Sequence, residues 1–200
     1  MDCLDTQRPL TFCKRGLLFL KKIFKHISKI WRKGIYFAEK KIQTMLKGKQ
    51  APDFSLFSSD KAKVNLSDFI GKENILILFF PQAFTGICTN ELCSVRDNIS
   101  LYQNLNAQVI GISVDSVFTL AKFKELEKLN FPMLSDFNKE VSSLYGSIYE
   151  SFTDMGMKGV SKRSAFVIDK QGVIQYEEVL ESAGDVPNFE AINEILKSLQ

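Results

Sequence analysis

Cys88 is the residue of this sequence best placed to carry out chemistry. It lies seven residues after Pro81, which closes the apolar run Ile75–Phe80, and it opens a stretch that reads as a helix. At a helix N-terminus, unpaired backbone N–H groups and the positive end of the helix dipole surround a side chain. Such surroundings favour a thiolate over a thiol, and the thiolate is the reactive species. The sequence therefore predicts cysteine chemistry.

The single histidine, His26, lies in a lysine-rich segment far from Cys88 in the sequence. A Cys–His nucleophile pair would need a histidine within hydrogen-bond reach of the thiol. The four cysteines and one histidine also lack the paired C-x2-C spacing of a zinc module. We therefore expect no metal, and we expect an arginine or lysine, the helix dipole or local N–H and O–H donors to activate the thiol.

The chain of 200 residues divides into two parts of unlike charge. Residues 1–44 hold 11 Lys and Arg against 3 Asp and Glu, whereas residues 45–200 hold 15 against 20. An acidic body without a basic stripe argues against nucleic acid as the substrate. No apolar stretch approaches the ~20 residues that cross a bilayer. We expect a leader or extension at 1–44 and one globular domain at 45–200.

Residues 16–44 alternate apolar and basic side chains at helical spacing, which predicts a basic amphipathic helix. Three interpretations stay open: a peripheral membrane anchor, an organelle-import leader, or an extension without function, because Met45 would make a natural start. Four cysteines are too few for a disulfide-stapled secreted fold, so we expect a reducing, cytoplasmic setting unless residues 1–44 direct the chain elsewhere. Cys3 and Cys13 are interpreted as incidental.

Strands and helices alternate from residue 45 onward. Short β-branched and leucine-rich runs predict buried strands at 75–80 and 108–114. Two further strands, 164–168 and 173–176, flank the hairpin signal Asp-Lys-Gln-Gly. Helices are predicted at 85–104, at 116–129 and at the C-terminus, around 189–199. A βαβ crossover followed by a hairpin and a terminal helix predicts a mixed-sheet α/β domain with helices on both faces.

A helix over residues 85–104 would place Cys88 on its inward face. Its neighbours on that face are Leu92, Val95, Ile99 and Tyr102. Cys93 falls nearer to the wetter face, on which Thr89, Arg96 and Ser100 lie. Thr85 precedes the cysteine by three residues, so its hydroxyl can cap the helix or point at a ligand on the sulfur. For Arg96 we expect solvent or a carboxylate partner.

The spacing Pro81-x3-Thr85-x2-Cys88 resembles the active-site signature of the peroxiredoxins, thioredoxin-fold enzymes that reduce hydroperoxides with a cysteine. Further blocks resemble those of the family in the same order: 51–56, 79–81, 111–115, 131–136 and 163–169. Residues 84–88 and the loop near 156–161 are most similar to the alkyl hydroperoxide reductase E type. The resemblance covers nearly all of 45–200 and implies a thioredoxin-like mixed sheet flanked by helices.

The resemblance also implies roles for single residues. Cys88 is the peroxidatic cysteine, Thr85 the hydroxyl beside the peroxide, Pro81 the shield of the pocket and Arg163 the arginine beside the sulfur. Glu91 is expected to support them by hydrogen bonding. A guanidinium favours a neighbouring thiolate and can hydrogen-bond peroxide oxygens from its planar fork. The implied activity is reduction of hydrogen peroxide and small organic hydroperoxides through a sulfenic acid, with no cofactor.

Cys93 follows Cys88 by five residues, a spacing similar to that of the bacterioferritin comigratory protein group of peroxiredoxins, which implies that Cys93 resolves the sulfenic acid. In an intact helix these two Cα atoms would stand about 8.6 Å apart. A disulfide needs them within about 7 Å, so oxidation must unwind the first turns. The alternatives are resolution by an external thiol, or a non-catalytic redox sensor of the same fold.

The resemblance further implies a thioredoxin-like or other thiol reductant as partner, and either a monomer or a homodimer. A general thiol–disulfide oxidoreductase on this fold would normally carry C-x2-C at the helix start. That motif is absent from the sequence.

Overall fold

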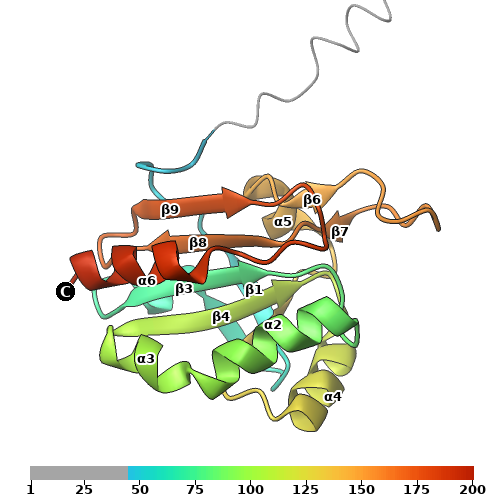
Figure 1. Cartoon of the computed structure of the whole chain (residues 1–200), viewed down its shortest axis with the longest axis horizontal. Helices are drawn as coiled ribbons and strands as arrows, with labels where there is room; N and C mark the ends of the chain where they lie inside the picture. Colours follow the sequence, from blue (N-terminus) through green and yellow to red (C-terminus); the bar gives the residue numbers. More distant parts are fainter. Residues whose placement is uncertain (1–44) are drawn as a thin grey trace, which may run out of the picture. The chain divides into compact units, whose positions relative to one another are not determined.

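Seven strands form one mixed sheet in the computed structural model of the chain, which describes residues 45–200 (Figure 1). Across the sheet they run β2 (Lys63–Asn65), β1 (Ser55–Ser58), β5 (Met133–Ser135), β4 (Ala107–Ser113), β3 (Asn74–Phe79), β8 (Ser164–Ile168) and β9 (Ile174–Val179). The pairs β3–β4 and β4–β5 are parallel, and the other neighbouring pairs are antiparallel. Strands β6 (Ile148–Tyr149) and β7 (Val160–Ser161) pair separately.

The helices surround this sheet (Figure 1). They are η1 (Leu66–Asp68), α2 (Gly86–Asp97), α3 (Ile99–Asn104), α4 (Val117–Glu127), α5 (Glu140–Leu144) and α6 (Phe189–Ser198). Among the described residues, no helix has the length and apolar character needed to span a membrane. The predicted amphipathic helix of 16–44, which includes His26, lies outside the described residues. So do Cys3 and Cys13.

Strand β3 is the centre of the domain, and all six of its residues are buried. It pairs in parallel with β4 and antiparallel with β8, so both of its edges are occupied. A central strand covered on both faces reads as a continuous apolar run, which is why Asn-Ile-Leu-Ile-Leu-Phe suits this place. The strand therefore gives the site a rigid base.

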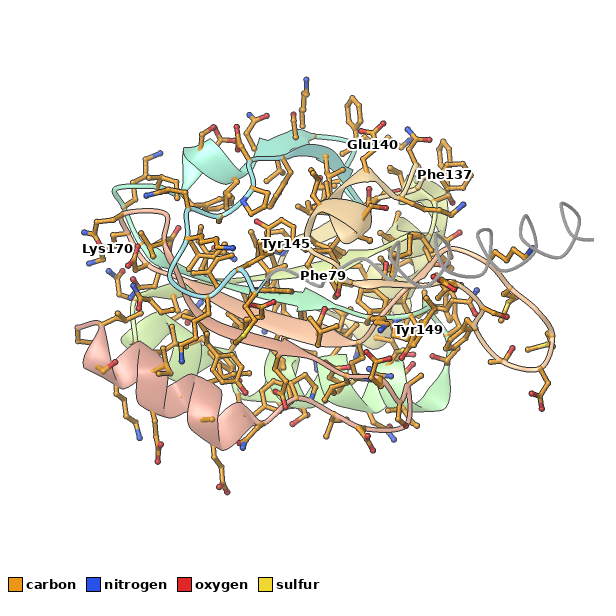
Figure 2. The ribbon with its side chains drawn as sticks, turned by 90° about the horizontal axis from the view of Figure 1, so that it is seen from above. Phe79, Phe137, Glu140, Tyr145, Tyr149 and Lys170 are labelled. Atoms are coloured by element: carbon orange, nitrogen blue, oxygen red, sulfur yellow. The ribbon has the colours of Figure 1, made fainter. Side chains whose placement is uncertain are left out.

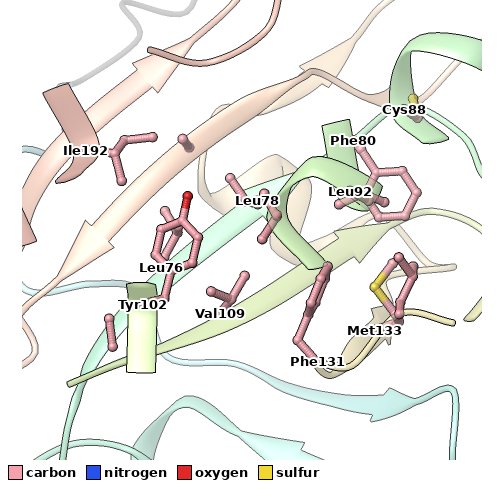
Figure 3. Packing of buried hydrophobic residues seen from close by; sticks show 14 of the residues in the cluster. Leu76, Leu78, Phe80, Cys88, Leu92, Tyr102, Val109, Phe131, Met133 and Ile192 are labelled. Atoms are coloured by element: carbon pink, nitrogen blue, oxygen red, sulfur yellow. The ribbon is translucent and has the colours of Figure 1, made fainter. Parts of the chain in front are cut away.

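Each face of the sheet carries its own apolar cluster. On one face Leu76, Leu78 and Val109 pack with Leu92 of α2 and Ile192 of α6 (Figure 3). Cys88 belongs to this cluster. The helix that carries the cysteine is therefore fixed by the same apolar layer that stabilises the sheet.

On the opposite face, Tyr145, the C-cap residue of α5, packs against Phe79 (Figure 2) and Phe166, with ring centroids 5.4 and 5.1 Å away. Its hydroxyl donates to the carbonyl of Pro52 at 2.9 Å. Burial on both faces confirms the prediction of a mixed sheet flanked by helices.

The hairpin prediction is also confirmed, because β8 and β9 pair antiparallel. Asp169 accepts hydrogen bonds from the backbone N–H groups of Gln171 and Val173, each at 2.9 Å, and Gly172 has a positive φ of 83°. Such a conformation is open to glycine at no steric cost.

The prediction of one helix over 85–104 is wrong. The helix is broken at Asn98, where φ is −107° and ψ is 18°, so α2 and α3 are separate. The Asn98 side chain donates to the carbonyl of Ser94 at 2.9 Å. Asparagine competes for backbone groups in this way, which favours a helix end over a helix interior. The inward face continues across the break, since Val95 and Tyr102 are both buried.

Candidate active site

A cavity of about 260 Å³ opens at the N-terminus of α2. It is lined by Pro81, Thr85, Gly86, Ile87, Cys88, Phe152, Thr153, Arg163, Ala183 and Gly184. Four of the predicted site residues therefore line this one cavity: Pro81, Thr85, Cys88 and Arg163. The fifth, Cys93, does not line it.

Cys88 lies in the first turn of α2 and is buried. Thr85 is the N-cap residue, but its side chain makes no capping bond. The predicted capping role is wrong, because the hydroxyl instead donates to the carbonyl of Gln82 at 2.9 Å. The first N–H groups of a helix have no partner within the helix. Without a side-chain cap they are available to a ligand beside the sulfur.

Arg163 contacts the sulfur directly. Its Nη2 donates to Cys88 Sγ at 3.3 Å and to the carbonyl of Ala183 at 3.1 Å, and its Nη1 donates to the carboxylate of Glu91. The arginine precedes β8, whose first residue Ser164 pairs with Phe79 at the end of β3. The guanidinium is therefore brought to the strand end from which the Cys88 loop departs, although it comes from 75 positions further along the chain.

The arginine and Glu91 form a buried ion pair, with side chains 1% and 0% exposed. Burial raises the pKa of Glu91 from 4.5 to about 7, against the opposing effect of Arg163. Burial also acts to lower the pKa of Arg163, but the carboxylate and Cys88 raise it above its ordinary value. Among the described residues, Glu91 Oε1 and Arg163 Nε have no hydrogen-bond partner. The site therefore keeps a fixed cation whose carboxylate partner titrates near neutrality.

Asp115 fixes the loop between β3 and α2. Its carboxylate accepts from the Ala83 N–H and from the Ser113 hydroxyl, both at 2.8 Å. The loop includes Phe84 at a φ of 62°, with its ring edge-on to Phe123 at 5.0 Å. A bulky residue in that conformation persists only where its surroundings hold it. The sequence comparison placed Asp115 in a family block without giving it this role.

Residues from two later segments complete the described lining of the cavity, and sequence reasoning missed them. Phe152 and Thr153 lie between β6 and β7, and the Ala183 carbonyl that accepts from Arg163 follows β9. A main-chain carbonyl carries no sequence signal, because any residue supplies one. These positions could be found only from the fold.

Cys93 faces α4, away from the cavity lining. Its sulfur lies 3.4 Å from Arg96 Nη1 and 3.6 Å from Glu127 Oε2. Burial, followed by smaller effects of Glu127 and Asp97, raises the pKa of Cys93 against the opposing effect of Arg96. Arg96 also pairs with Asp97 at 2.8 Å, so its predicted carboxylate partner is confirmed. Both cysteines of α2 are free thiols on an intact helix.

A mixed sheet flanked by helices, with a buried cysteine where a strand passes into a helix, defines a thiol-based protein of the thioredoxin-like fold class. The comparison with solved structures supports this fold class. A peroxidoxin from Mycobacterium tuberculosis, BcpB, matches with a TM-score of 0.69 and 27% identity, over 78% of this chain and 99% of the other. The AhpC/TSA family model matches residues 47–177, and the chain belongs to this family.

Two relatives with similar sequences show how far the similarity to this family extends. Alkyl hydroperoxide reductase E of Mycobacterium tuberculosis is 36% identical over 66% of this chain and 84% of its own length. The chloroplastic 2-Cys peroxiredoxin BAS1 of Spinacia oleracea is 33% identical over 78% of this chain. This chain spans 58% of the length of that spinach relative.

Proposed function

We propose that this protein is a thiol-dependent peroxidase that reduces hydrogen peroxide and small organic hydroperoxides at Cys88. The observation that carries the proposal is the 3.3 Å contact between Arg163 Nη2 and Cys88 Sγ within the cavity at the start of α2. A fixed cation beside a sulfur favours the thiolate, which is the nucleophile that peroxide chemistry needs. The relatives are named as peroxiredoxins and alkyl hydroperoxide reductases, which supports the same activity.

In the proposed first step, the Cys88 thiolate attacks one oxygen of the hydroperoxide. The S–O bond forms while the O–O bond breaks, and the second oxygen leaves as water or an alcohol after protonation. The product is a sulfenic acid on Cys88, the first and reversible oxidation state of cysteine. Arg163 and the free N–H groups of α2 stabilise the charge that develops on the leaving oxygen, and the Thr85 hydroxyl aligns the peroxide. Pro81, which is buried and lines the cavity, excludes water from the sulfur.

In the proposed second step, Cys93 resolves the sulfenic acid and a thioredoxin-like reductant reopens the disulfide. The two cysteines share α2, so their Cα atoms are about 8.6 Å apart by helix geometry, beyond the reach of a disulfide. The start of α2 must therefore unwind during turnover. The alternative is an external thiol that attacks Cys88 directly, in which case Cys93 has no part in turnover.

The proposal includes the organisation of the chain. The described cavity and the residues to which we assign roles belong to the unit 45–200, which supports a catalytic domain there and a leader or extension at 1–44. A reducing compartment suits an enzyme that cycles between thiol and disulfide. The relatives come from chloroplasts and from bacteria, so they do not share one compartment. We therefore propose that residues 1–44 determine where in the cell this chain is located.

A mixing experiment on the full chain tests the proposal. The reduced protein receives one equivalent of hydrogen peroxide or tert-butyl hydroperoxide, is quenched with dimedone, and is mapped by peptide mass. We expect a dimedone adduct on Cys88 in the wild type and none in Cys88→Ser. Consumption of peroxide at the same rate by Cys88→Ser would refute the assignment.

A turnover assay with thioredoxin and thioredoxin reductase separates the remaining alternatives. We expect Cys93→Ser to form the sulfenic acid normally but to lose turnover and the Cys88–Cys93 disulfide. Undiminished turnover in this variant would support the external thiol. A single oxidation without any turnover in the wild type would support a redox sensor.

A further inference from the structure

Cys93 lies in a polar setting that the first half of the proposed reaction does not use. One side of its sulfur faces the Arg96 guanidinium at 3.4 Å, and the other faces the Glu127 carboxylate at 3.6 Å. These two groups come from different helices, Arg96 from α2 and Glu127 from the last position of α4. A cation and a carboxylate that both contact one half-buried thiol form a small acid–base cluster.

We propose that Glu127 and Arg96 are the catalytic pair of the resolving step, in which Glu127 accepts the proton of Cys93 and Arg96 stabilises the resulting thiolate. This inference rests on the proposed function, because it requires that Cys93 resolve the sulfenic acid on Cys88. It adds a second catalytic site on the far side of α2 from the cavity.

The step balances without any further reactant. The Cys93 thiol gives its proton to Glu127, and the sulfur electron pair attacks the sulfur of the Cys88 sulfenic acid. The S–S bond forms, the S–O bond of the sulfenic acid breaks, and the departing hydroxide takes the proton from Glu127 and leaves as water. Glu127 ends as the carboxylate it was at the start.

The same contacts decide which cysteine moves. Arg96 Nη1 donates to the backbone carbonyl of Glu127, and Asn130 donates to the backbone carbonyl of Arg96 at 3.3 Å. These bonds attach the last turn of α2 to the end of α4 and the segment after it, whereas the first turn of α2 carries no side-chain cap. The uncapped turn is the part that unwinds, so Cys88 travels to Cys93, which stays beside its acid–base pair.

The cluster also predicts that Cys93 does not compete with Cys88 for peroxide. The charged groups that face its sulfur are Arg96 and Asp97 on α2 and Glu127 on α4. Burial and the two carboxylates outweigh the arginine and raise the pKa of the thiol, so Cys93 rests as the unreactive protonated form. Loss of the proton is then a step that needs a base within reach, and Glu127 is that base.

The test is the rate of Cys88–Cys93 disulfide formation in Glu127→Gln, measured in the full chain. After one equivalent of hydrogen peroxide, samples are acid-quenched at intervals and mapped by peptide mass for sulfenic acid and disulfide. Glutamine keeps the size of the side chain but cannot take the proton. We expect disulfide formation at neutral pH to slow about 10²-fold, the usual contribution of a general base, and to recover as the pH is raised.

A matched control lies on the same helix. Glu125 is 67% exposed and pairs with Lys122 at 2.8 Å, and no contact joins it to Cys93 among the described residues. Glu125→Gln makes the same chemical change, so we expect it to form the disulfide at the wild-type rate. For the cation, we expect Arg96→Gln to slow the step about 10-fold and Arg96→Lys, which retains the charge, to restore most of that loss.

The outcomes separate this inference from the proposed function. A disulfide rate in Glu127→Gln equal to that in Glu125→Gln, with no change in its pH profile, would overturn the inference and leave the peroxidase intact. Full turnover of Cys93→Ser would overturn both the inference and intramolecular resolution. Absence of sulfenic acid in the wild type would refute the peroxidase itself. Normal sulfenic acid formation shows that a variant is folded. If Glu127→Gln does not fold, the comparison of Arg96→Gln with Arg96→Lys carries the test, and equal disulfide rates in these two variants and the wild type would overturn the inference.

Discussion

At the scale of single residues, one guanidinium organises the site. Arg163 is fully buried and divides its donors among a sulfur, a carboxylate and a backbone carbonyl. The planar guanidinium of arginine can donate to three acceptors at fixed angles, whereas the ammonium group of lysine, on its flexible side chain, cannot. Because its side chain is fixed before any substrate arrives, little reorganisation is needed when charge develops in the transition state.

Replacement of Arg163 by lysine tests whether the geometry of the guanidinium matters as well as its charge. We expect Arg163→Lys to slow sulfenic acid formation on Cys88 about 10²-fold, because lysine keeps the charge but loses the geometry of the paired donors. The measurement is the rate of dimedone-trappable oxidation after addition of hydrogen peroxide. A rate within twofold of the wild type would show that charge alone is sufficient. Circular dichroism controls for folding, since the substitution leaves Glu91 with an altered partner.

Glu91 gives the stability of the protein a pH dependence. The folded-state pKa is about 7 against 4.5 for the ordinary group, so the folded protein binds more protons than the unfolded chain between these values. The contribution of Glu91 to the free energy of unfolding is therefore full at low pH and is lost as the pH rises towards about 7. Its size is on the order of 3 kcal/mol at most.

The variant Glu91→Gln removes this titration. We expect the variant to gain stability relative to the wild type as the pH rises from about 4.5 to about 7, because only the wild type loses its Glu91 contribution. Urea unfolding followed by circular dichroism at several pH values gives the difference directly. A difference that is constant with pH would contradict the raised pKa, and the subtraction cancels the other carboxyl groups.

At the scale of elements, the helices differ in how their N-termini are satisfied. Ser116 caps α4 by accepting from the Thr119 N–H at 3.1 Å, and Asn188 caps α6 in the same way. The start of α2 has no such bond, although Thr85 is a residue type that usually caps. Of these three helices, α2 is the one without a side-chain cap, and it holds the proposed reactive thiol.

Loss of the α4 cap should weaken the fold measurably. We expect Ser116→Ala to lower the free energy of unfolding by about 1 kcal/mol, the usual cost of a lost N-cap. Ser94→Ala, at an exposed position within α2, is the control and should stay within about 0.5 kcal/mol of the wild type. Equal unfolding midpoints for the two variants in urea would contradict the capping role.

Much of this arrangement was predictable because local patterns decided it. The run at β3, the hairpin turn at 169–172 and the inward face that includes Cys88 each follow from periodicity or turn chemistry. The break at Asn98 was missed, since a helical stripe of apolar residues continues across it. The Thr85 hydroxyl was misplaced because its choice between the helix and the Gln82 carbonyl depends on loop geometry.

The role of tertiary contacts was harder to anticipate. Nothing in the sequence near Glu127 indicates that its carboxylate faces Cys93 from a second helix. The Ala183 carbonyl likewise reaches Arg163 only through the path of the chain after β9. Contacts of this kind are set by packing between distant segments, and periodicity carries no information about them.

At the scale of the whole molecule, residues 45–200 contain a sheet buried on both faces and the cavity at the start of α2. Every residue to which we assign a role at the site belongs to this part of the chain. We therefore expect a chain that begins at Met45 to keep the wild-type rate of sulfenic acid formation within twofold and the free energy of unfolding within about 0.5 kcal/mol. Quench-flow kinetics and urea unfolding provide the comparison. A larger loss would assign the first segment a part in the fold.

The separation of 75 positions between Cys88 and its arginine has a consequence for how the protein is made. Ribosomes add roughly 5–20 residues per second, so Cys88 is incorporated roughly 4 to 15 seconds before Arg163. During translation the unfinished chain carries an ordinary cysteine. The reactivity of Cys88 begins only when β8 docks against β3. A chain truncated before β8 therefore neither reduces peroxide rapidly nor is rapidly oxidised by it.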